Sequence, residues 1–159
     1  MTLPRHQVKV AVITAVYNGQ STLAKCINSV QRQTYPDIHH LIVDGASTDN
    51  SLEVILANTH SRLSYISEKD NGMYDAMNKG TCLLDADYYL YLNADDWLYD
   101  NNCVSEFMSY AEQYDTLSRV RPLIVGQIVH AYRENIYDLW RYPSSAKELA
   151  FGYPPHPST

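Results

Sequence analysis

Apolar residues in the first part of the chain form two patterns: a continuous run typical of a buried strand, and a spacing typical of one face of a helix. Residues 8–15 (VKVAVITA) are almost continuously apolar and rich in β-branched side chains, which predicts a strand buried on both faces. A turn signal at residues 16–19 follows, and Ser21 is placed to cap a helix over residues 22–33. The expected buried face of that helix comprises Leu23, Cys26, Ile27 and Val30.

The same succession of strand and helix recurs along the next fifty residues. Short apolar runs at residues 40–43 and 63–67 predict a second and a third strand. Between them, a helix is expected to turn Leu52, Ile55 and Leu56 inward, and another helix is expected at about residues 73–84. This rhythm predicts an α/β fold in which a parallel sheet is connected by right-handed crossovers.

The run from Tyr88 to Trp97 is apolar and aromatic, and it ends in the adjacent carboxylates of Asp95 and Asp96. It is too short for a membrane span, so we expect a buried strand that delivers both acids to its carboxyl end. Adjacent carboxylates repel each other unless a cation lies nearby, and a divalent ion that carries a phosphorylated substrate is a common solution. The alternative is that one acid caps a helix ahead of Trp97.

Four strand ends should therefore meet at one edge of the sheet. The segments at this edge are residues 17–19, 44–49, 68–72 and 95–96. Open α/β sheets bind their ligands at the carboxyl ends of the strands, so this edge is the expected functional site.

The remainder of the chain has a less regular pattern. A helix is expected at about residues 104–114 and a strand at residues 123–130, whereas residues 132–147 read as a mobile connection or a hairpin. The Pro-rich residues 151–159 have no closing helix or strand, so we expect a truncated chain. One domain over residues 1–159 is predicted, with a nucleotide-binding part at 8–100 and a partial acceptor-side part at 101–159.

Composition narrows the class of function. The 159 residues are 45% hydrophobic and carry a formal charge of −6, which fits a globular protein and argues against nucleic-acid binding by bulk charge. Three scattered cysteines fit reduced thiols, and the sequence offers neither a signal peptide nor a transmembrane run, so a cytoplasmic location is expected, with peripheral contact at the inner face of the membrane left open. The sequence lacks dinucleotide and P-loop glycine motifs, so a metal or Lys79 must neutralise phosphate.

Four ordered blocks of the sequence resemble glycosyltransferase family 2, the inverting enzymes of the GT-A fold. The blocks are TAVYN at 14–18, VDGASTD at 43–49, SEKDNGMYDAMNKG at 67–80 and LNADD at 92–96, and PPHP at 154–157 looks like a fifth. The resemblance is closest to bacterial members that build cell-surface polysaccharides. It implies a Rossmann-like three-layer sandwich with a mostly parallel central sheet, a nucleotide-sugar donor (usually a UDP-sugar), Mn²⁺ or Mg²⁺, and a saccharide or lipid-linked acceptor.

Carried over residue by residue, the resemblance assigns the two acids different roles. Asp96 matches the acid that binds the metal at the diphosphate, and Asp95 matches the acid that holds the ribose or the donor sugar. Because neighbouring strand residues point to opposite faces, both are not expected to bind one ion directly. His156 matches a histidine that lies near the acceptor or completes the metal site, with a bystander role as the alternative.

The other matched residues concern the nucleotide. Tyr17, with Ala15 and Asn18, matches the turn that packs on the base, with a plain turn or core tyrosine as the alternative. Asp44 matches an acid that contacts base or ribose, but Gly45 replaces the second acid of a common Asp-Asp pair, so support of the turn is the alternative role for Asp44. Asp70 and Asn71 match the segment that borders the donor. Two further residues are interpreted structurally: Asp49 as a helix cap and Lys79 as a surface lysine.

An inverting transfer requires a general base for the acceptor hydroxyl, and the sequence offers no clear candidate. Glu134, Asp138 and Glu148 qualify by position alone, so no base is assigned. Two other functions fit the same residues: a sugar-nucleotide-binding domain without transferase activity, and a metal-dependent nucleotidyltransferase. The latter would be expected to carry a basic loop after the first strand, and residues 17–20 contain no cation.

Overall fold

The computed structural model describes residues 8–118, 128–132 and 135–140. The chain divides into two compact units, one that extends to Met108 and one that begins at Ser109. The first unit contains the predicted nucleotide-binding part. The assignment of the whole chain to one domain stays a prediction.

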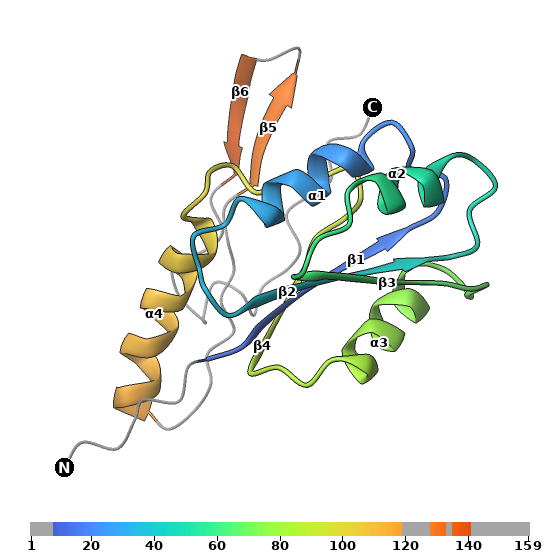
Figure 1. Cartoon of the computed structure of the whole chain (residues 1–159). Helices are drawn as coiled ribbons and strands as arrows, with labels where there is room; N and C mark the ends of the chain where they lie inside the picture. The colour runs from blue at the N-terminus through green and yellow to red at the C-terminus, as the bar shows by residue number, and fades with distance from the viewer. Residues whose placement is uncertain (1–7, 119–127, 133–134, 141–159) are drawn as a thin grey trace. The chain divides into compact units, whose positions relative to one another are not determined.

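A four-stranded parallel sheet forms the centre of the first unit. Its strands are β1 (Val10–Val16), β2 (Ile38–Asp44), β3 (Leu63–Ser67) and β4 (Tyr88–Tyr91), in the spatial order β3-β2-β1-β4 (Figure 1). β1 and β2 are aligned along their whole length, from Val10 opposite Ile38 to Val16 opposite Asp44. The predicted parallel α/β sheet is confirmed, and the carboxyl ends of its strands lie at one edge.

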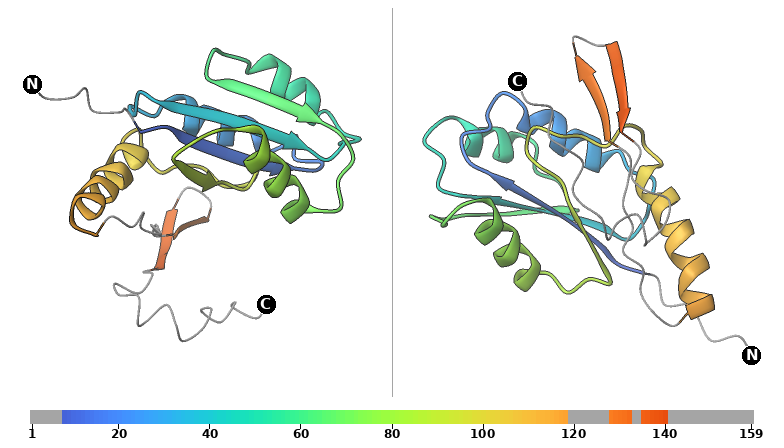
Figure 2. Two further views of the ribbon diagram at one scale, coloured as in Figure 1. Left: turned by 90° about the horizontal axis from the view of Figure 1, so that it is seen from below. Right: turned by 180° about the vertical axis from the view of Figure 1, so that it is seen from behind.

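Three helices cover the two faces of this sheet. α1 (Leu23–Gln31) and α2 (Ser51–Ala57) lie on one face, and α3 (Met73–Leu83) lies on the other (Figures 1 and 2). This is the three-layer arrangement that crossovers of one hand produce in a parallel sheet when the strand order reverses direction.

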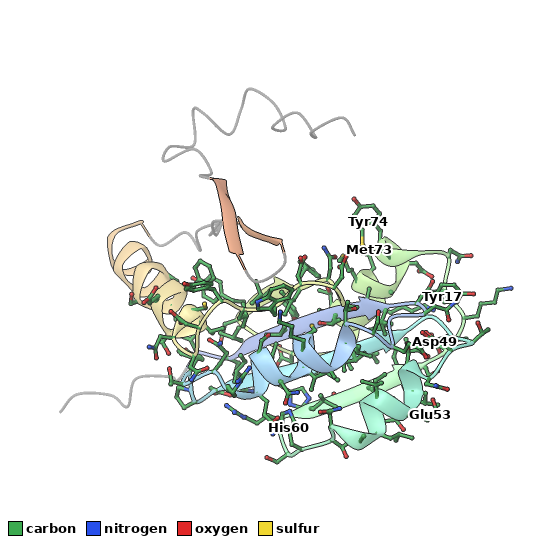
Figure 3. All side chains as sticks on the ribbon, turned by 90° about the horizontal axis from the view of Figure 1, so that it is seen from above. Tyr17, Asp49, Glu53, His60, Met73 and Tyr74 are labelled. Carbon is green, nitrogen blue, oxygen red and sulfur yellow. The ribbon has the colours of Figure 1, made fainter. Side chains whose placement is uncertain are left out.

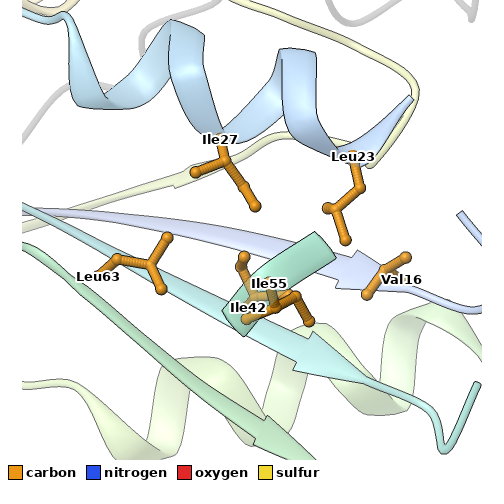
Figure 4. Close-up of a cluster of buried hydrophobic side chains, with 6 residues drawn as sticks. All are labelled: Val16, Leu23, Ile27, Ile42, Ile55 and Leu63. Atoms are coloured by element: carbon orange, nitrogen blue, oxygen red, sulfur yellow. The ribbon is translucent and has the colours of Figure 1, made fainter. Parts of the chain in front are cut away.

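Two apolar clusters join the layers. On the α1 and α2 side, six side chains are packed together: Val16, Leu23, Ile27, Ile42, Ile55 and Leu63 (Figure 4). On the α3 side, Ile13, Leu41, Val43 and Ala76 form the second cluster. Neighbouring residues of one strand therefore enter opposite clusters, as Leu41, Ile42 and Val43 do, which explains why these strands are apolar without interruption.

Three details of the predicted elements are wrong. α1 has Thr22 as its N-cap, and Ser21 does not cap the helix. Leu56 is 49% exposed, because the short helix α2 turns Ser51 and Ile55 inward instead. β4 has only four residues and forms an edge of the described sheet, where its side chains are half-buried or exposed, so the expected buried strand is not found.

Beyond β4, α4 (Cys103–Ser118) covers and extends the helix predicted at residues 104–114. β5 (Ile128–Tyr132) and β6 (Asn135–Trp140) pair antiparallel. Of the two interpretations of residues 132–147, this pairing agrees with the hairpin for residues 135–140, and residues 141–147 lie outside the described ones. The strand predicted at 123–130 coincides with β5 only over residues 128–130, since 123–127 lie outside the described residues. Within the described ranges, no helix combines the length and the hydropathy needed to cross a membrane.

Candidate functional site

A cavity of about 970 Å³ opens at the carboxyl ends of the strands. It is bordered by the turn after β1, the loop after β2, the segment that leads into α3 and the turn after β4. Five of the predicted site residues line it: Ala15, Tyr17, Asn18, Asp70 and Asp95. Asp44 ends β2, and Asn71 and Asp96 belong to two of these loops. None of the three lines the cavity, and His156 lies outside the described residues.

Tyr17 presents its ring to this cavity from the turn that follows β1. Its side chain is 63% exposed, so it is not part of the core (Figure 3). The turn is tight, because a Cβ atom on Gly19 would come within 2.7 Å of Val16 Cγ2. An exposed aromatic ring on a fixed turn provides a flat surface on which a planar group can stack.

The neighbouring Asn18 connects two of the bordering loops. It adopts a left-handed backbone conformation with φ of 55°, which asparagine tolerates better than most residues. Its Oδ1 accepts hydrogen bonds from the backbone N–H groups of Thr48 (2.8 Å) and Asp49 (3.3 Å), and its own N–H donates to Ser47 Oγ (2.8 Å). Asn18 therefore fixes the β1 turn against the loop after β2.

Asp49 and Ser51 complete this connection. Asp49 Oδ1 accepts hydrogen bonds from the backbone N–H and the hydroxyl of Ser51 at the start of α2, at 2.9 and 2.6 Å. Ser51 Oγ in turn accepts a hydrogen bond from the Gly19 N–H (2.8 Å). The interpretation of Asp49 as a structural residue at the helix start agrees with these contacts, although Asn50 occupies the N-cap position.

Asp44 is buried at the end of β2, with 1% of its surface exposed. Its carboxylate accepts hydrogen bonds from the Ser47 backbone and hydroxyl and from Ser67 Oγ (2.6 Å). These contacts hold the loop after β2 and tie it to β3, so Asp44 does support the turn. A contact from Asp44 to a nucleotide stays a prediction.

Gly45 and Asp70 share one small space at the cavity wall. A Cβ atom on Gly45 would lie 2.6 Å from Asp70 Oδ2, and Asp70 Oδ1 accepts a hydrogen bond from the Gly72 N–H at 2.8 Å. The glycine that replaces the second acid of the Asp-Asp pair thus leaves room for a carboxylate that arrives from the neighbouring loop. The sequence shows that Gly45 replaces the second acid of the pair, but it does not show that the Asp70 side chain fills the space beside Gly45.

The loop before α3 explains the roles of several charged residues. Gly72 has φ of 107° and ψ of 174°, a combination that essentially only glycine adopts, and it directly precedes α3. Asn71 bonds to Asp75 through its backbone N–H (2.9 Å), while Lys79 Nζ lies 2.9 Å from Glu68 Oε1. The hydrogen bond to Glu68 is the main cause of a raised pKa for Lys79. Lys79, on helix α3, is thus paired with Glu68 in the loop before the helix.

Lys69 is the cation that sequence reasoning missed. It lines the cavity, whereas Lys79 does not. Its position in the loop directly after β3, at the edge where ligands bind, was the signal that could have identified it.

Asp95 and Asp96 lie in a turn and not in the strand. The Asp96 N–H donates to the Asn93 carbonyl (3.1 Å), and Asn93 Nδ2 donates to Asp96 Oδ2 (3.0 Å). The expectation based on alternating strand faces therefore does not apply. The helix-cap alternative is also wrong, because no helix begins in the described chain between β4 and Cys103, where α4 starts.

These two carboxylates influence one buried thiol. Cys26 on α1 has a pKa raised to about 11, chiefly by burial and in smaller part by the negative charges of Asp96 and Asp95. Cys26 is therefore a neutral thiol, and it donates a hydrogen bond to the Asn93 carbonyl (3.5 Å).

The described residues contain no group of three or more acidic, histidine or cysteine side chains that could hold a metal ion by themselves. An ion that binds at the Asp95–Asp96 turn would need ligands from a bound phosphate, which is how Mg²⁺ sites in phosphate-binding proteins are commonly built. Both carboxylates are exposed, and Asp96 Oδ1 accepts no hydrogen bond from the described part of the chain. The turn thus fits a shared metal–phosphate site with Asp96 as a protein ligand.

The sheet and its cavity define an α/β protein with a ligand site at the carboxyl edge of the strands. Residues 11–154 match the family described as glycosyl transferase family 2, and the chain belongs to this family. The predicted family membership is confirmed.

Curated relatives of the chain are also named as glycosyltransferases. A PGL/p-HBAD biosynthesis glycosyltransferase from Mycobacterium bovis is 32% identical over 122 residues, which are 75% of this chain and 46% of that protein. Glycosyltransferase GlyA from Streptococcus pneumoniae is 34% identical over 57% of this chain and 13% of its own length. The chain thus spans about half (46%) of the length of the first relative and 13% of the length of the second.

Solved structures share the fold. The mannosyltransferase PcManGT from Pyrobaculum calidifontis, in complex with GDP-Man and Mn²⁺, has a TM-score of 0.61 at 21% identity and is covered over 34% of its chain and 73% of this one. TarS 1-349 of S. aureus in complex with UDP-GlcNAc has a TM-score of 0.59 at 19% identity, over 31% of its chain and 66% of this one. Both similarities support the predicted GT-A type of α/β fold.

Proposed function

We propose that this chain forms the donor-binding part of a glycosyltransferase that transfers a sugar, with inversion, from a nucleotide-sugar to a saccharide or lipid-linked acceptor. The favoured donor is a UDP-sugar, and the favoured process is the synthesis of a bacterial cell-surface polysaccharide. The observation that carries the proposal is the convergence of an exposed tyrosine, Tyr17, and the acidic Asp70 and Asp95 on one cavity of about 970 Å³.

Each side chain has a role that its chemistry allows. Tyr17 stacks on the nucleobase, and Asp95 accepts hydrogen bonds from hydroxyls of the ribose or the donor sugar. Asp96 holds a divalent ion, Mn²⁺ or Mg²⁺, together with the diphosphate, and when bound this ion neutralises charge on the leaving nucleoside diphosphate. Support for an ion also comes from the Mn²⁺ and GDP-Man in the structure of PcManGT. A third ligand from His156 remains part of the proposal.

A cytoplasmic location, with contact at the inner face of the membrane, belongs to the same proposal. All three cysteines are free thiols, which fits a reducing compartment.

The base contact is tested by measuring UDP affinity calorimetrically for Tyr17→Ala. Loss of stacking should weaken binding by about 1 to 3 kcal/mol. Tyr99→Ala is the matched control, because Tyr99 is similarly exposed, at 68%, and does not line the cavity. Equal affinities for both variants would remove Tyr17 from the nucleotide site.

The metal contact is tested by comparing UDP affinity in Mn²⁺ with that in EDTA. We expect tighter binding with Mn²⁺ in the unmodified chain and no difference in Asp96→Ala. Asp85→Ala is the control, since Asp85 is an exposed carboxylate in the loop that leads into the opposite end of β4. If Asp96→Ala still binds UDP more tightly in Mn²⁺ than in EDTA, Asp96 is not the metal ligand.

The second candidate function is binding of a sugar nucleotide without transfer. It rests on the sequence analysis, which assigns no general base for the acceptor hydroxyl. Nuclear magnetic resonance of a reaction with a UDP-sugar separates the two functions: release of UDP with an inverted anomeric centre supports transfer, whereas an intact donor supports binding alone.

A further inference from the structure

The turn at Asn93–Asp96 is held by one face of helix α1. Three side chains of that helix contact the segment that follows β4: Lys25, Cys26 and Ser29. They lie at successive positions i, i+1 and i+4, and each makes a different kind of contact.

Ser29 and Cys26 hold the backbone of the segment. Ser29 Oγ accepts a hydrogen bond from the Leu98 N–H (3.1 Å) and donates one to the Cys26 carbonyl (2.8 Å). The Cys26 thiol donates to the Asn93 carbonyl at 3.5 Å, which also accepts the Asp96 N–H at 3.1 Å. The two carboxylates are therefore flanked on both sides by backbone that is bonded to α1.

Lys25 makes the third contact. Its Nζ lies 3.2 Å from the centroid of the Trp97 ring, within the range of a cation–π interaction. Trp97 directly follows Asp96, and 39% of its surface is exposed, so the lysine ammonium lies over a ring that is partly open to solvent. This contact fixes the side of the turn that carries Asp96.

The start of the same helix also borders the cavity, next to the acidic turn, since a Cβ atom on Gly19 would lie 3.5 Å from Ala94 Cβ. Gly19 and Thr22, just before α1, line the cavity, and α1 continues from there to the residues that hold the carboxylate turn. Helix α1 thus adds to the β1–β4 strand pairing in setting the position of the β1 turn, with Tyr17, relative to the acidic turn. A site for a ligand that spans base and diphosphate depends on this relative position.

We propose that Lys25, Cys26 and Ser29 are positioning residues that preorganise the Asp95–Asp96 turn for a metal-bound diphosphate. The inference rests on the proposed function. Groups that orient metal ligands affect metal affinity by about 10-fold or more when they are lost. An exposed four-residue turn without such support would sample several conformations, and binding would have to order it.

The test uses Lys25→Met, which keeps the length of the side chain and removes its charge. The unmodified chain, Lys25→Met, Lys25→Arg and the control Lys9→Met are compared for UDP affinity in Mg²⁺ and in EDTA. We expect the ratio of the two affinities to fall about 10-fold in Lys25→Met, with metal-free affinity unchanged. Arginine also stacks on aromatic rings, so Lys25→Arg should restore the ratio. Lys9 precedes β1 at the other end of the sheet, and its replacement should change nothing.

Fluorescence supplies a readout that does not depend on nucleotide. The chain has two tryptophans, so in a Trp140→Phe background the emission comes from Trp97 alone. Lys25→Met should shift the emission maximum, and Mg²⁺ with UDP should change it less than in the parent.

Any one of three results would overturn the inference. The first is an unchanged affinity ratio in Lys25→Met, and the second is unchanged Trp97 emission. The third is an equal loss of metal-free and metal-dependent affinity, because that would indicate direct phosphate binding by Lys25. Ser29→Ala gives a second, independent variant, checked for folding by thermal unfolding, and should lower the ratio in the same direction. If the unmodified chain binds no UDP at all, the proposed function fails instead, and the emission of Trp97 still tests the contact.

Discussion

At the scale of single residues, Gly45 and Asp70 form a pair in which one leaves space for the other. The Asp70 carboxylate accepts a hydrogen bond from Gly72 through one oxygen, and its second oxygen would lie only 2.6 Å from a Cβ atom at residue 45. Because the contact is with the end of a side chain, a methyl group at residue 45 should displace the carboxylate and leave the fold intact.

We therefore expect Gly45→Ala to change UDP affinity severalfold while the free energy of unfolding changes by less than about 1 kcal/mol. In an Asp70→Ala background, Gly45→Ala should have no further effect on affinity. A double-mutant cycle by calorimetry measures this coupling. Additive effects of the two substitutions would contradict the idea that they share one space.

His40 is a buried histidine that is kept neutral. Its side chain faces Thr14, with Nε2 2.9 Å from Thr14 Oγ1, and its Nδ1 has no hydrogen-bond partner among the described residues. Burial lowers its pKa from 6.5 to about 3, with a smaller contribution from the charges of His60 and His39. Between these pH values, the unfolded chain binds a proton that the folded chain does not bind.

Stability should therefore rise with pH through this window and be lost as the pH falls from about 6.5 toward 3. One proton corresponds to a slope of up to about 1.4 kcal/mol per pH unit. Urea unfolding between pH 5 and 7 measures the slope, and His40→Gln, which retains a partner for Thr14, should reduce it. The same slope in both proteins would show that His40 is not responsible.

At the scale of elements, helix α3 lies so close to the sheet that glycine is required at residue 80. A Cβ atom there would be 2.6 Å from Ile13 Cγ2 and 3.3 Å from Val43 Cγ2, both in the buried core. Alanine in a helix normally gains about 0.5 to 1 kcal/mol over glycine. Here the overlap with β1 should cost more than this gain.

Gly80→Ala is expected to destabilise the chain by about 1 to 3 kcal/mol in urea unfolding. Asn78→Ala, at an exposed position of the same helix, should be neutral or slightly stabilising. A more stable Gly80→Ala protein would mean that α3 lies farther from the sheet.

The elements also show where the apolar pattern was sufficient. All four predicted inward residues of α1 are buried, because a nine-residue helix has enough turns to define its buried face. α2 has seven residues, and its inner face includes the polar Ser51, whose hydroxyl is used by Gly19 and Asp49. A hydrophobic pattern cannot identify such a residue, and the prediction of Leu56 was wrong for this reason.

At the scale of the whole molecule, a ligand that binds the cavity should stabilise every element that borders it. A thermal-shift panel of UDP-, GDP- and dTDP-sugars, with and without Mn²⁺, tests this. At a concentration 100 times its Kd, a ligand contributes about 2.7 kcal/mol, which corresponds to a rise in Tm of about 5 to 11 °C.

The largest shift is expected for a UDP-sugar with Mn²⁺. A larger shift with a GDP-sugar would leave the site in place and correct the base. No shift with any of them would argue against a nucleotide site in this chain.

Sequence by itself determined the order of strands and helices, the parallel sheet, the edge at which the loops meet and the family. These follow from local periodicity and from short blocks of residues, which need no knowledge of distant contacts. It also identified Tyr17, Asn18, Asp70 and Asp95 as neighbours at one site.

Only the tertiary structure decided how those residues are supported. The burial of Asp44, the space shared by Gly45 and Asp70, and the turn that carries Asp96 all depend on side chains 20 or more residues apart in the sequence. β4 likewise reads as buried from its composition, yet its place in the strand order puts it at an edge of the described sheet. Pairing between distant segments sets such features, and a local pattern carries no information about which segments will pair.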